Sequence, residues 1–429
     1  MSKKYSDKRI DKRERKFERM SLNTIELGNP ETSHDNRKSK LWSKQYILTL
    51  IAMFAASITM TLFMPLLPIY IKMIGGNISL AGLVVSIFTI AALIFRPISA
   101  VLIDKYGRKS ILIIGFVLIT VGCLGYRFIT LMYAFLIIRV IHGIGYGSST
   151  NATGAIVADV VPKERRGQGI GYYGFVMASS VALGPALGLL VMKNFNIKAA
   201  FGVAIVLAAI GLIASLFISY EQKPTFPHSP KNSGKVNANS SHGFGYEKTA
   251  LPASLVMLLV AFAYSGIVTF LPTYANVLGL GDISIYFIIY AVALLVTRIA
   301  VDRITKKRNI SVVLLPGIVL MAVAFILLSI GKTLPYFLIA AVIYGVGYGS
   351  VQPTLNAIVV SLCKPSRRGS ANSTFFSAMD LGIGVGAFVW GIVSQTFGYS
   401  AIYYGCIGFM VLSIVAYFKL LARQLNKAV

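Results

Sequence analysis

The sequence predicts an all-α membrane protein whose twelve transmembrane helices form two pseudo-symmetric six-helix bundles. Composition is the first reason: 56% of the 429 residues are hydrophobic and the mean hydropathy is +0.72, whereas a soluble domain is roughly 45–50% apolar. The second reason is that apolar stretches of membrane-spanning length recur along the chain. The third is that the second half of the chain repeats the first. These observations exclude an ordinary soluble protein.

The apolar stretches match the thickness of a bilayer. A hydrocarbon core of about 30 Å is crossed by a helix of about 20 apolar residues. Twelve stretches meet this requirement, at 46–71, 80–102, 110–127, 131–161, 168–193, 198–220, 251–279, 282–302, 310–331, 335–362, 370–394 and 400–421. Some of these limits include loop residues, because helix ends are marked less clearly in a sequence than helix centres.

An internal repeat divides the spans into two sets of six. A shift of 202 residues aligns FLIIRVIHGIGYGSS (135–149) with FLIAAVIYGVGYGSV (337–351), and RRG at 165–167 with RRG at 367–369. We therefore predict an N-terminal bundle over 46–220 and a C-terminal bundle over 251–421, both in the same orientation. Parallel halves of this kind are typical of transporters whose site lies near the bilayer midplane, between the halves.

Three segments lie outside the predicted bundles. Residues 1–45 mix basic and acidic side chains, as in KRIDKRERKFER, so we expect a disordered cytoplasmic tail and not a signal peptide. Residues 221–250 are rich in Pro, Ser, Asn and Gly and predict a flexible cytoplasmic linker. Residues 422–429 are expected to form a short cytoplasmic tail.

The net charge of +26 is explained by membrane topology. The loops on one side of the predicted bundles are strongly basic and contain Lys105, Arg108, Lys109, Lys163, Arg165, Arg166, Lys223, Lys231, Lys235, Lys248, Arg303, Lys306, Lys307, Arg308, Lys364, Arg367 and Arg368. The opposite loops contain only Lys72, Arg127, Lys193, Lys198 and Lys332. By the positive-inside rule, both termini of this multi-pass cell-membrane protein lie in the cytoplasm. The expected surroundings are the lipid bilayer, and no nucleic-acid partner is implied.

The loop AVLIDKYGRKS (100–110) carries a specific pattern of an acid, a glycine and basic residues. Gly107 permits a tight turn there. The pattern resembles the signature loop of the major facilitator superfamily, with Ala100 where glycine is usual and Lys105 where arginine is common, and the resemblance extends over nearly all of 46–421. It implies a major facilitator fold and a conformational latch on the cytoplasmic side, formed by Asp104, Lys105, Gly107, Arg108 and Lys109. Plain topogenic charge is the alternative.

The second copy of this loop, RIAVDRITKKR (298–308), keeps an acid and basic residues but loses the glycine. Arg298 and Asp302 are four residues apart on one helix face, where an ion pair is possible. Arg298 lies only about 6 Å from the predicted inner end of its span. We therefore expect its side chain to snorkel to the membrane surface.

RVIHGIGYG (139–147) places two ionisable residues inside a predicted span. Arg139 lies about 12 Å from the outer end, where a charge costs several kcal/mol without water or a partner. The stretch resembles the fourth-helix signature of the superfamily, which implies a role for Arg139 in proton coupling; a fixed pair that ties helices together is the alternative. His142 titrates near pH 6.5 when unperturbed and is either a proton carrier or a neutral, hydrogen-bonded group.

Asp380, in FFSAMDLGIGVG (375–386), is the acid near the centre of a predicted span, about 15 Å from either end. An intramembrane ionisable residue is a functional hypothesis by default. We predict that Asp380 handles a proton or a cationic substrate, and a static buried hydrogen bond is the alternative. The sequence leaves open whether Arg139 approaches it.

The fifth predicted span contains GYYGFVMASSVALGPALGLL (171–190). Gly171, Gly184, Pro185 and Gly188 match the spacing of the motif that marks antiporters in the superfamily, whereas Ser180 and Leu189 occupy positions that are usually glycine. Small residues also permit close helix packing in any membrane bundle. The motif therefore favours export, with simple packing as the alternative.

The resemblance places spans 1, 4, 7 and 10 around a central cavity. The residues that they would contribute are Thr59, Met60, His142, Tyr146, Tyr264, Tyr344, Tyr348 and Gln352. Aromatic and Met surfaces suit varied ligands, although the same side chains also pack well against neighbouring helices.

These features predict a proton-coupled secondary active transporter that exports a small amphipathic compound or metabolite by antiport and alternating access. Uptake by symport is an alternative, because the antiporter motif is imperfect. The first span has no acidic residue, unlike many multidrug exporters of this type, so a specialised exporter of an endogenous metallophore-like metabolite is another. A non-transporting membrane sensor is a remote alternative. The expected partners are a small-molecule substrate and protons, and the expected state is a monomer.

Enzymes and ATP-driven pumps are disfavoured. No P-loop or nucleophile-and-base arrangement appears, and GIGYG and GIGVG lack the βαβ unit of a dinucleotide site. Cys123, Cys363 and Cys406 are isolated and have neither disulfide-framework nor metal-ligand spacing. We expect no cofactor and no bound metal.

Overall fold

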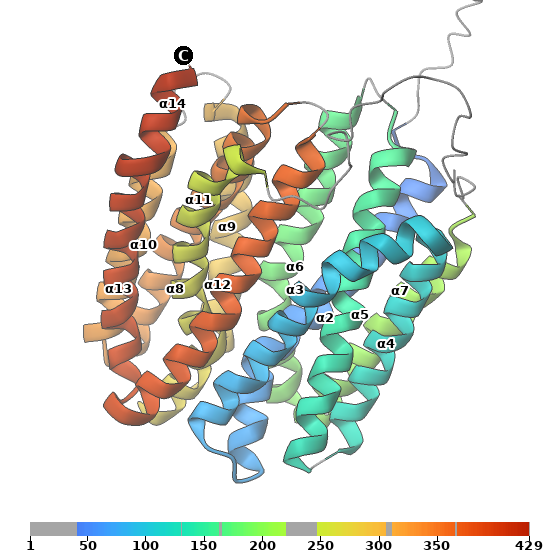
Figure 1. Ribbon diagram of the computed structural model, residues 1–429. Helices are drawn as coiled ribbons and strands as arrows, with labels where there is room; N and C mark the ends of the chain where they lie inside the picture. Colours follow the sequence, from blue (N-terminus) through green and yellow to red (C-terminus); the bar gives the residue numbers. More distant parts are fainter. Residues whose placement is uncertain are drawn as a thin grey trace, which may run out of the picture. The chain divides into compact units, whose positions relative to one another are not determined.

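The computed structural model describes residues 41–129, 131–162, 165–219, 247–305, 311–364 and 367–428. Within these ranges the chain is helical and contains no strand, as Figure 1 shows. Most of the predicted N-terminal tail and of the predicted linker lies outside the described residues. The long helices are α2 (Lys44–Met73), α3 (Ile78–Tyr106), α4 (Arg108–Phe128), α5 (Met132–Val160), α6 (Arg166–Asn194), α7 (Ile197–Phe217), α8 (Leu251–Val277), α9 (Ser284–Thr305), α10 (Ser311–Ile330), α11 (Leu334–Leu362), α12 (Arg368–Phe397) and α13 (Tyr399–Ala416).

Each predicted span corresponds to one of these helices, so the all-α prediction is confirmed. Among the described residues, eleven helices are long and apolar enough to cross a membrane. The remaining long helix is α5, whose apolar sequence is interrupted by Arg139 and His142. The predicted C-terminal tail is helical as well, because a π-helical turn at Tyr417–Leu421 leads from α13 into α14 (Ala422–Ala428).

Polar side chains and glycines begin and end the helices. The side chain of Asn77 accepts a hydrogen bond from the Leu80 amide at the start of α3, and Asn196 does the same for Ala199 at the start of α7. Such caps satisfy amide groups that have no partner within the helix. Gly107 has a φ of 88° and joins α3 to α4 without a longer loop, as the sequence predicted.

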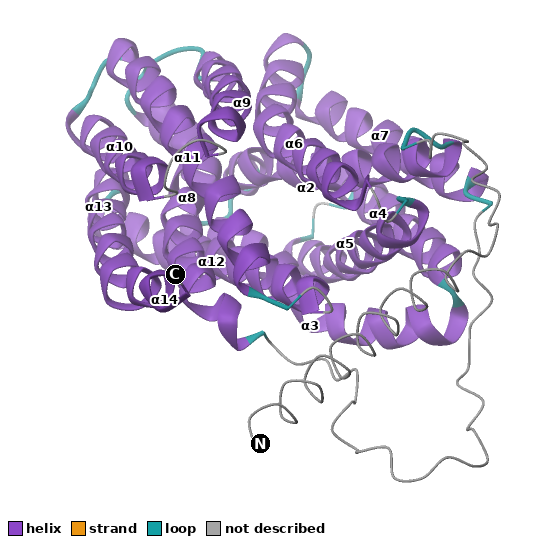
Figure 2. Ribbon diagram, turned by 90° about the horizontal axis from the view of Figure 1, so that it is seen from above, coloured by secondary structure: helices purple, strands orange, loops and turns teal. Residues whose placement is uncertain are grey.

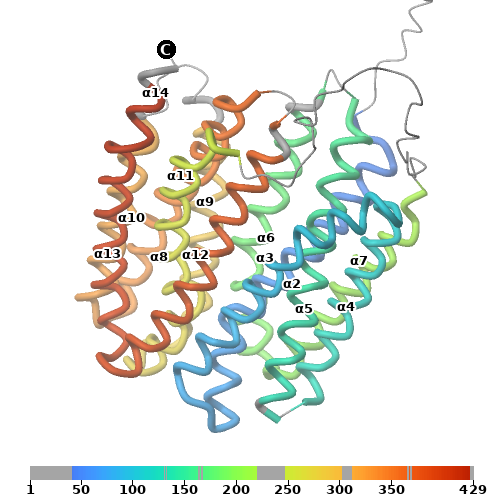
Figure 3. Tube along the Cα trace, in the orientation of Figure 1, coloured from blue at the N-terminus to red at the C-terminus, as the bar shows by residue number. Residues whose placement is uncertain are grey.

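The helices pack as two bundles. Helices α2 to α7 contact one another in the N-terminal bundle, and α8 to α13 do so in the C-terminal bundle. Figure 2 shows the two groups side by side, and Figure 3 shows the helices of each group by their colour along the sequence. The bundles touch where α3 packs on α12, α6 on α9 and α2 on α8.

The contact between α3 and α12 is a seam of small residues. A Cβ atom at Gly82 would overlap the carbonyl group of Ala387, and one at Gly384 would overlap the Thr89 hydroxyl. The Ser86 hydroxyl donates to the Gly384 carbonyl oxygen at 2.6 Å. Small residues allow two helix backbones to come this close in a membrane. The seam therefore holds the bundles together in the half of α3 that follows the α2–α3 loop.

A second contact closes the same end of the molecule. Lys193, near the end of α6, lies 2.6 Å from Asp282, which precedes α9. Burial raises the pKa of Asp282, but hydrogen bonds from Lys193 and Ser284 and the lysine charge outweigh it, so its pKa lies below the ordinary value. Asp282 is therefore ionised at neutral pH, and its contact with Lys193 links the two bundles.

Candidate functional site

Two buried charged residues meet between the bundles. Asp380 lies on α12, and its side chain is 2% exposed. Nη2 of Arg96, on α3 of the opposite bundle, lies 2.6 Å from Oδ2 of Asp380. Taking charges out of water costs several kcal/mol per ion, and only a close, well-arranged pair offsets that cost. This ion pair must therefore be broken or neutralised before α3 and α12 can separate.

Both partners lie far from the helix ends. At 1.5 Å per residue, Asp380 is about 18 Å from the first residue of α12, and Arg96 is about 15 Å from the last residue of α3. The sequence pointed to Asp380 but missed Arg96, because the predicted span ended at residue 102 and left Arg96 within reach of the membrane surface. In the structure α3 continues to Tyr106, so the guanidinium starts deeper.

The backbone of Arg96 is held in place by Asn151, and its guanidinium keeps one N–H donor without a partner among the described residues. Nδ2 of Asn151, on α5, donates to the Arg96 carbonyl oxygen at 2.8 Å and to Ser99 Oγ at 2.7 Å. Nε of Arg96 is buried and has no hydrogen-bond partner among the described residues. A buried donor without a partner costs about 1–3 kcal/mol. The site is therefore suited to take up water or another acceptor beside the pair.

A narrow pocket adjoins Asp380. We call it the coupling pocket. Both bundles line it, through Ser57, Met60, Thr61, Met64, Tyr146, Met177, Val181, Tyr264, Tyr348, Met379, Asp380 and Ile383. Met60, Tyr146, Tyr264 and Tyr348 were among the cavity residues that the sequence predicted. A ligand in this pocket would touch both bundles.

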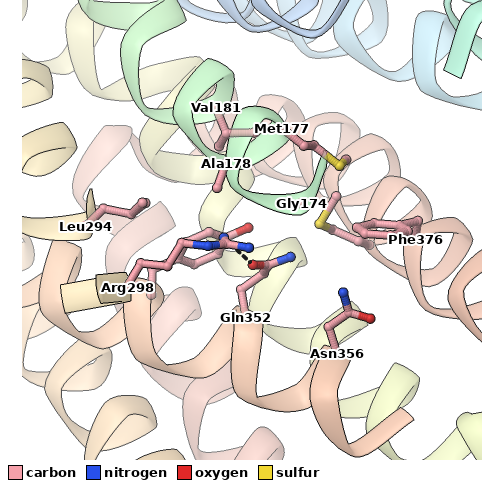
Figure 4. Close-up of a pocket in the computed structure, with 12 residues that line it drawn as sticks. Gly174, Met177, Ala178, Val181, Leu294, Arg298, Gln352, Asn356 and Phe376 are labelled. Atoms are coloured by element: carbon pink, nitrogen blue, oxygen red, sulfur yellow. Dashed lines mark hydrogen bonds between the residues drawn. The ribbon is translucent and has the colours of Figure 1, made fainter. Parts of the chain in front are cut away.

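A second narrow pocket shares Met177, Val181, Tyr348 and Met379 with the coupling pocket. We call it the arginine pocket, since Arg298 lines it together with Gly174, Ala178, Leu294, Gly349, Gln352, Asn356 and Phe376. Figure 4 shows the Arg298 guanidinium turned toward Gln352, to whose Oε1 it donates at 3.0 Å. The expectation that Arg298 snorkels is therefore wrong: its side chain finds a polar partner between helices. The side chain of Asp302 lies outside the described residues.

Three of the predicted cavity residues, Thr59, His142 and Tyr344, line neither pocket. Thr59 is fully buried and donates to the carbonyl oxygens of Ala55 and Ala56 on its own helix. Tyr344 packs its ring against Tyr264 and Tyr348, with centroid separations of 6.4 and 6.0 Å. Thr59 precedes Met60 by one residue, which turns it about 100° away around the helix at 3.6 residues per turn.

Arg139 and His142 are held within the N-terminal bundle. Nε of Arg139 donates to the Val84 carbonyl oxygen at 2.8 Å, and its guanidinium lies 4.4 Å from the centre of the Phe88 ring. Nη1 of Arg139 donates to the Tyr126 hydroxyl at 3.4 Å, and the same hydroxyl lies 3.1 Å from Nδ1 of His142. Aromatic faces stabilise a desolvated cation by about 2 kcal/mol. Arg139 is thus partnered without a carboxylate, and the acid between the bundles is paired with Arg96 instead.

Among the residues that the structure describes, the predicted latch residues form no ion pair between the bundles in this conformation. Asp104 and Lys105 are exposed, and Asp104 forms no ion pair with any residue that the structure describes. Nε of Arg108 lies 2.9 Å from Oδ2 of Asp159, near the end of α5 in the same bundle. Lys109 is half-buried at the start of α4.

The antiporter-like residues pack α6 against α2. A Cβ atom at Gly184 would overlap the Thr61 hydroxyl, and one at Gly188 would lie 3.0 Å from the Leu62 carbonyl oxygen. Pro185 is buried inside α6. Gly171 faces open space. Ser180, at a position that is usually glycine, accepts a hydrogen bond from Thr61 through its carbonyl oxygen at 2.8 Å.

Comparison with known proteins assigns this architecture. The sequence model of the family described as Major Facilitator Superfamily matches residues 49–386 and 283–428. The chain belongs to the major facilitator superfamily. It is therefore a transporter-family protein and not an enzyme, and its many apolar helices make it a multi-pass membrane protein.

Similar proteins of this superfamily include exporters. The chain is 25% identical over 409 residues to the multi-drug resistance efflux pump PmrA of Streptococcus pneumoniae, covering 89% of this chain and 98% of that protein. It is 25% identical over 386 residues to the staphylopine export protein of Staphylococcus aureus, covering 86% and 93%. Among solved structures, a bacterial homologue of the human lysosomal transporter Spinster has a TM-score of 0.69 at 15% identity, covering 89% of this chain and 97% of that one. This last likeness concerns the fold.

Proposed function

We propose that the protein exports a small amphipathic compound or metabolite in exchange for protons, by alternating access, with Asp380 as the proton carrier. The ion pair of Asp380 with Arg96 carries this proposal, since it joins the two bundles beside a pocket that both of them line. The similarity to proteins named as efflux pumps supports the direction of transport. The antiporter-like packing of α6 on α2 is consistent with it.

Proton binding changes the bundle contact directly. A proton on the Asp380 carboxylate removes its charge, and the neutral acid no longer forms an ion pair with Arg96. Arg96 remains charged and turns to water or to a polar group of the substrate in the coupling pocket. Loss of the pair weakens the contact between α3 and α12, so protonation favours the arrangement in which they separate. Substrate favours the other arrangement only as far as it binds the two states with different affinities.

Within this mechanism, Arg139 and His142 fix the N-terminal bundle through Val84, Phe88 and Tyr126 and act on coupling indirectly. We also propose that Asp104 and the basic residues beside it form their latch in the opposite conformation, since Asp104 is exposed here. The protein works as a monomer, with both termini in the cytoplasm.

A substrate screen in proteoliposomes under an imposed pH gradient tests the proposal. We expect substrate to leave the compartment that corresponds to the cytoplasm while protons enter it. Co-movement of substrate and protons in the same direction would establish uptake by symport instead. A gradient that has no effect on any flux would remove the proton from the mechanism.

One further candidate has its own support. The equal similarity to the staphylopine export protein supports a dedicated exporter of one metabolite beside the broad efflux that the similarity to PmrA suggests. The absence of acidic residues from α2 agrees with this narrower role.

A further inference from the structure

The arginine pocket contains a cation that the transport mechanism above does not use. Arg298 reaches into it from α9 and spends one donor on Gln352. A guanidinium has five N–H donors in a fixed fork. It is the charged side chain among the described residues that line this pocket, and most of the other residues there are apolar or aromatic. The pocket therefore combines one positive charge with an apolar wall.

Neutral polar groups lie beside the guanidinium. Gln352 and Asn356 are four residues apart on α11, so both side chains face the same direction, and Figure 4 shows both of them in the pocket with Arg298. Oδ1 of Asn356 is buried and has no hydrogen-bond partner among the described residues. The orphaned oxygen suits an N–H or O–H group of a ligand, while the amide nitrogens of both residues can donate without adding charge.

We propose that Arg298 binds the carboxylate of an anionic or zwitterionic substrate, with Gln352 and Asn356 as neutral donors. This inference rests on the proposed transport function and names its substrate class. A carboxylate accepts two parallel hydrogen bonds from a guanidinium fork, and one negative charge matches the single positive charge of the pocket. The apolar body of the substrate lies against Met177, Phe376 and Met379 and extends toward the coupling pocket.

The position of the guanidinium makes this site sensitive to conformation. A Cβ atom at Gly174, on α6 of the N-terminal bundle, would lie 3.5 Å from Nη2 of Arg298. The carboxylate site is therefore formed by α9 and α11 of one bundle and covered by α6 of the other. A ligand held there contacts both bundles, and its affinity changes when they move apart. This is the differential affinity that a transported substrate requires.

Equilibrium binding of three matched fluorescent probes to the purified full-length protein in detergent tests the assignment. Dansylglycine carries a carboxylate, dansylglycinamide is its neutral analogue, and dansylethylenediamine carries an ammonium group. We expect wild-type protein to bind the acid at least about tenfold more tightly than the amide, since charge-assisted hydrogen bonds are the stronger kind. The cationic probe binds more weakly than either. Equal affinity for acid and amide in the wild-type protein overturns the proposal without any variant.

Variants locate the effect. Arg298→Gln removes the preference for the acid. Arg298→Lys keeps the positive charge but loses the two parallel donors of the guanidinium, so it retains part of the preference. Arg127→Gln is the matched control, because it removes one arginine charge from an exposed position that contacts the Lys198 carbonyl oxygen. An acid preference that survives Arg298→Gln, or that disappears equally in Arg127→Gln, assigns the selectivity elsewhere.

This binding experiment is independent of coupling. It needs no pH gradient and no flux. If the acid preference holds while gradients fail to drive transport, the proposed proton coupling is wrong and the carboxylate site stands. If gradients drive transport and the preference is absent, the site assignment is wrong and the coupling stands.

Discussion

Two deeply buried arginines of this protein make an informative comparison. Arg139 is enclosed by aromatic rings and a backbone carbonyl group of its own bundle. Arg96 instead pairs with Asp380 of the other bundle. Both residues avoid the same desolvation cost. Burial by itself therefore does not identify a mechanistic charge, and the partner on the other bundle is what makes Arg96 the stronger candidate.

The largest expected effect concerns the partner between the bundles. Asp380→Asn removes the titratable group, so we expect pH-gradient-driven transport to fall by on the order of 100-fold or more, as for other positioned proton-transfer groups. Flux in proteoliposomes with and without a pH gradient measures it. Glu247→Gln is the matched control, because that acid pairs with Arg367 inside one bundle and belongs to no proposed site. Unchanged gradient-driven flux in Asp380→Asn would end its assignment as proton carrier.

The second prediction concerns the arginine that stays within its bundle. Arg139→Met leaves the Val84 carbonyl oxygen without its donor and removes the cation over Phe88, so we expect the protein to lose about 2–4 kcal/mol of stability. Thermal unfolding in detergent measures this loss. The pH dependence of the remaining transport stays that of the wild type. A shifted pH profile in a variant of normal stability would instead place Arg139 in proton coupling.

Two glycines sharpen the comparison between bundle interior and bundle interface. Gly184→Val places atoms against Thr61 inside the N-terminal bundle, so it lowers thermal stability by about 1–3 kcal/mol, as overpacking does. Gly82→Val meets the Ala387 carbonyl group across the seam, where the bundles can separate to relieve the overlap. We expect it to leave stability nearly unchanged and to shift the population away from this conformation. Cysteine accessibility beside α3 would show that shift, and equal destabilisation by both variants would contradict it.

The smallest effect is expected at the exposed pair of Lys193 and Asp282. Since the pKa of Asp282 is lowered in the folded protein, the pair contributes fully above the ordinary aspartate pKa and is lost as pH falls through the lowered value. Lys193 is 53% exposed, so the contribution is at most about 1 kcal/mol and is screened by salt. Asp282→Asn should shift the conformational equilibrium only a few-fold. High salt should produce the same small shift in the wild type, because it screens the ion pair. A tenfold shift of the conformational equilibrium would show that this contact stabilises the conformation more than an exposed ion pair can.

The helices could be predicted from sequence because each depends on local properties, namely the length and apolarity of one stretch. Asp380 could be predicted for the same reason, since its depth follows from counting residues along one span. Its partner could not be. Arg96 and Asp380 are far apart in sequence, and only the packing of α3 on α12 brings them together. A few residues of error at the end of α3 were enough to make Arg96 resemble a surface residue.

The pocket residues show the same limit at finer scale. Met60 and Thr59 are neighbours in sequence, yet one lines the coupling pocket and the other bonds to its own backbone. The rotation of α2 about its axis decides between them, and that rotation depends on the helices packed around it. Arg298 was assigned to the membrane surface from its short distance to the end of its span, and its partner Gln352 lies on another helix, where residue counting could not reveal it.

The glycine seam between α3 and α12 bears on the speed of transport. Helices that touch through their backbones have no interlocked side chains to withdraw, so parting them requires no exchange of rotamers. Once the pair of Arg96 with Asp380 and the hydrogen bond from Ser86 are broken, the elementary movement is a tilt of stiff rods, and the remaining resistance comes mainly from the lipid and water that must rearrange around them. Turnover should accordingly follow the thickness and fluidity of the bilayer closely.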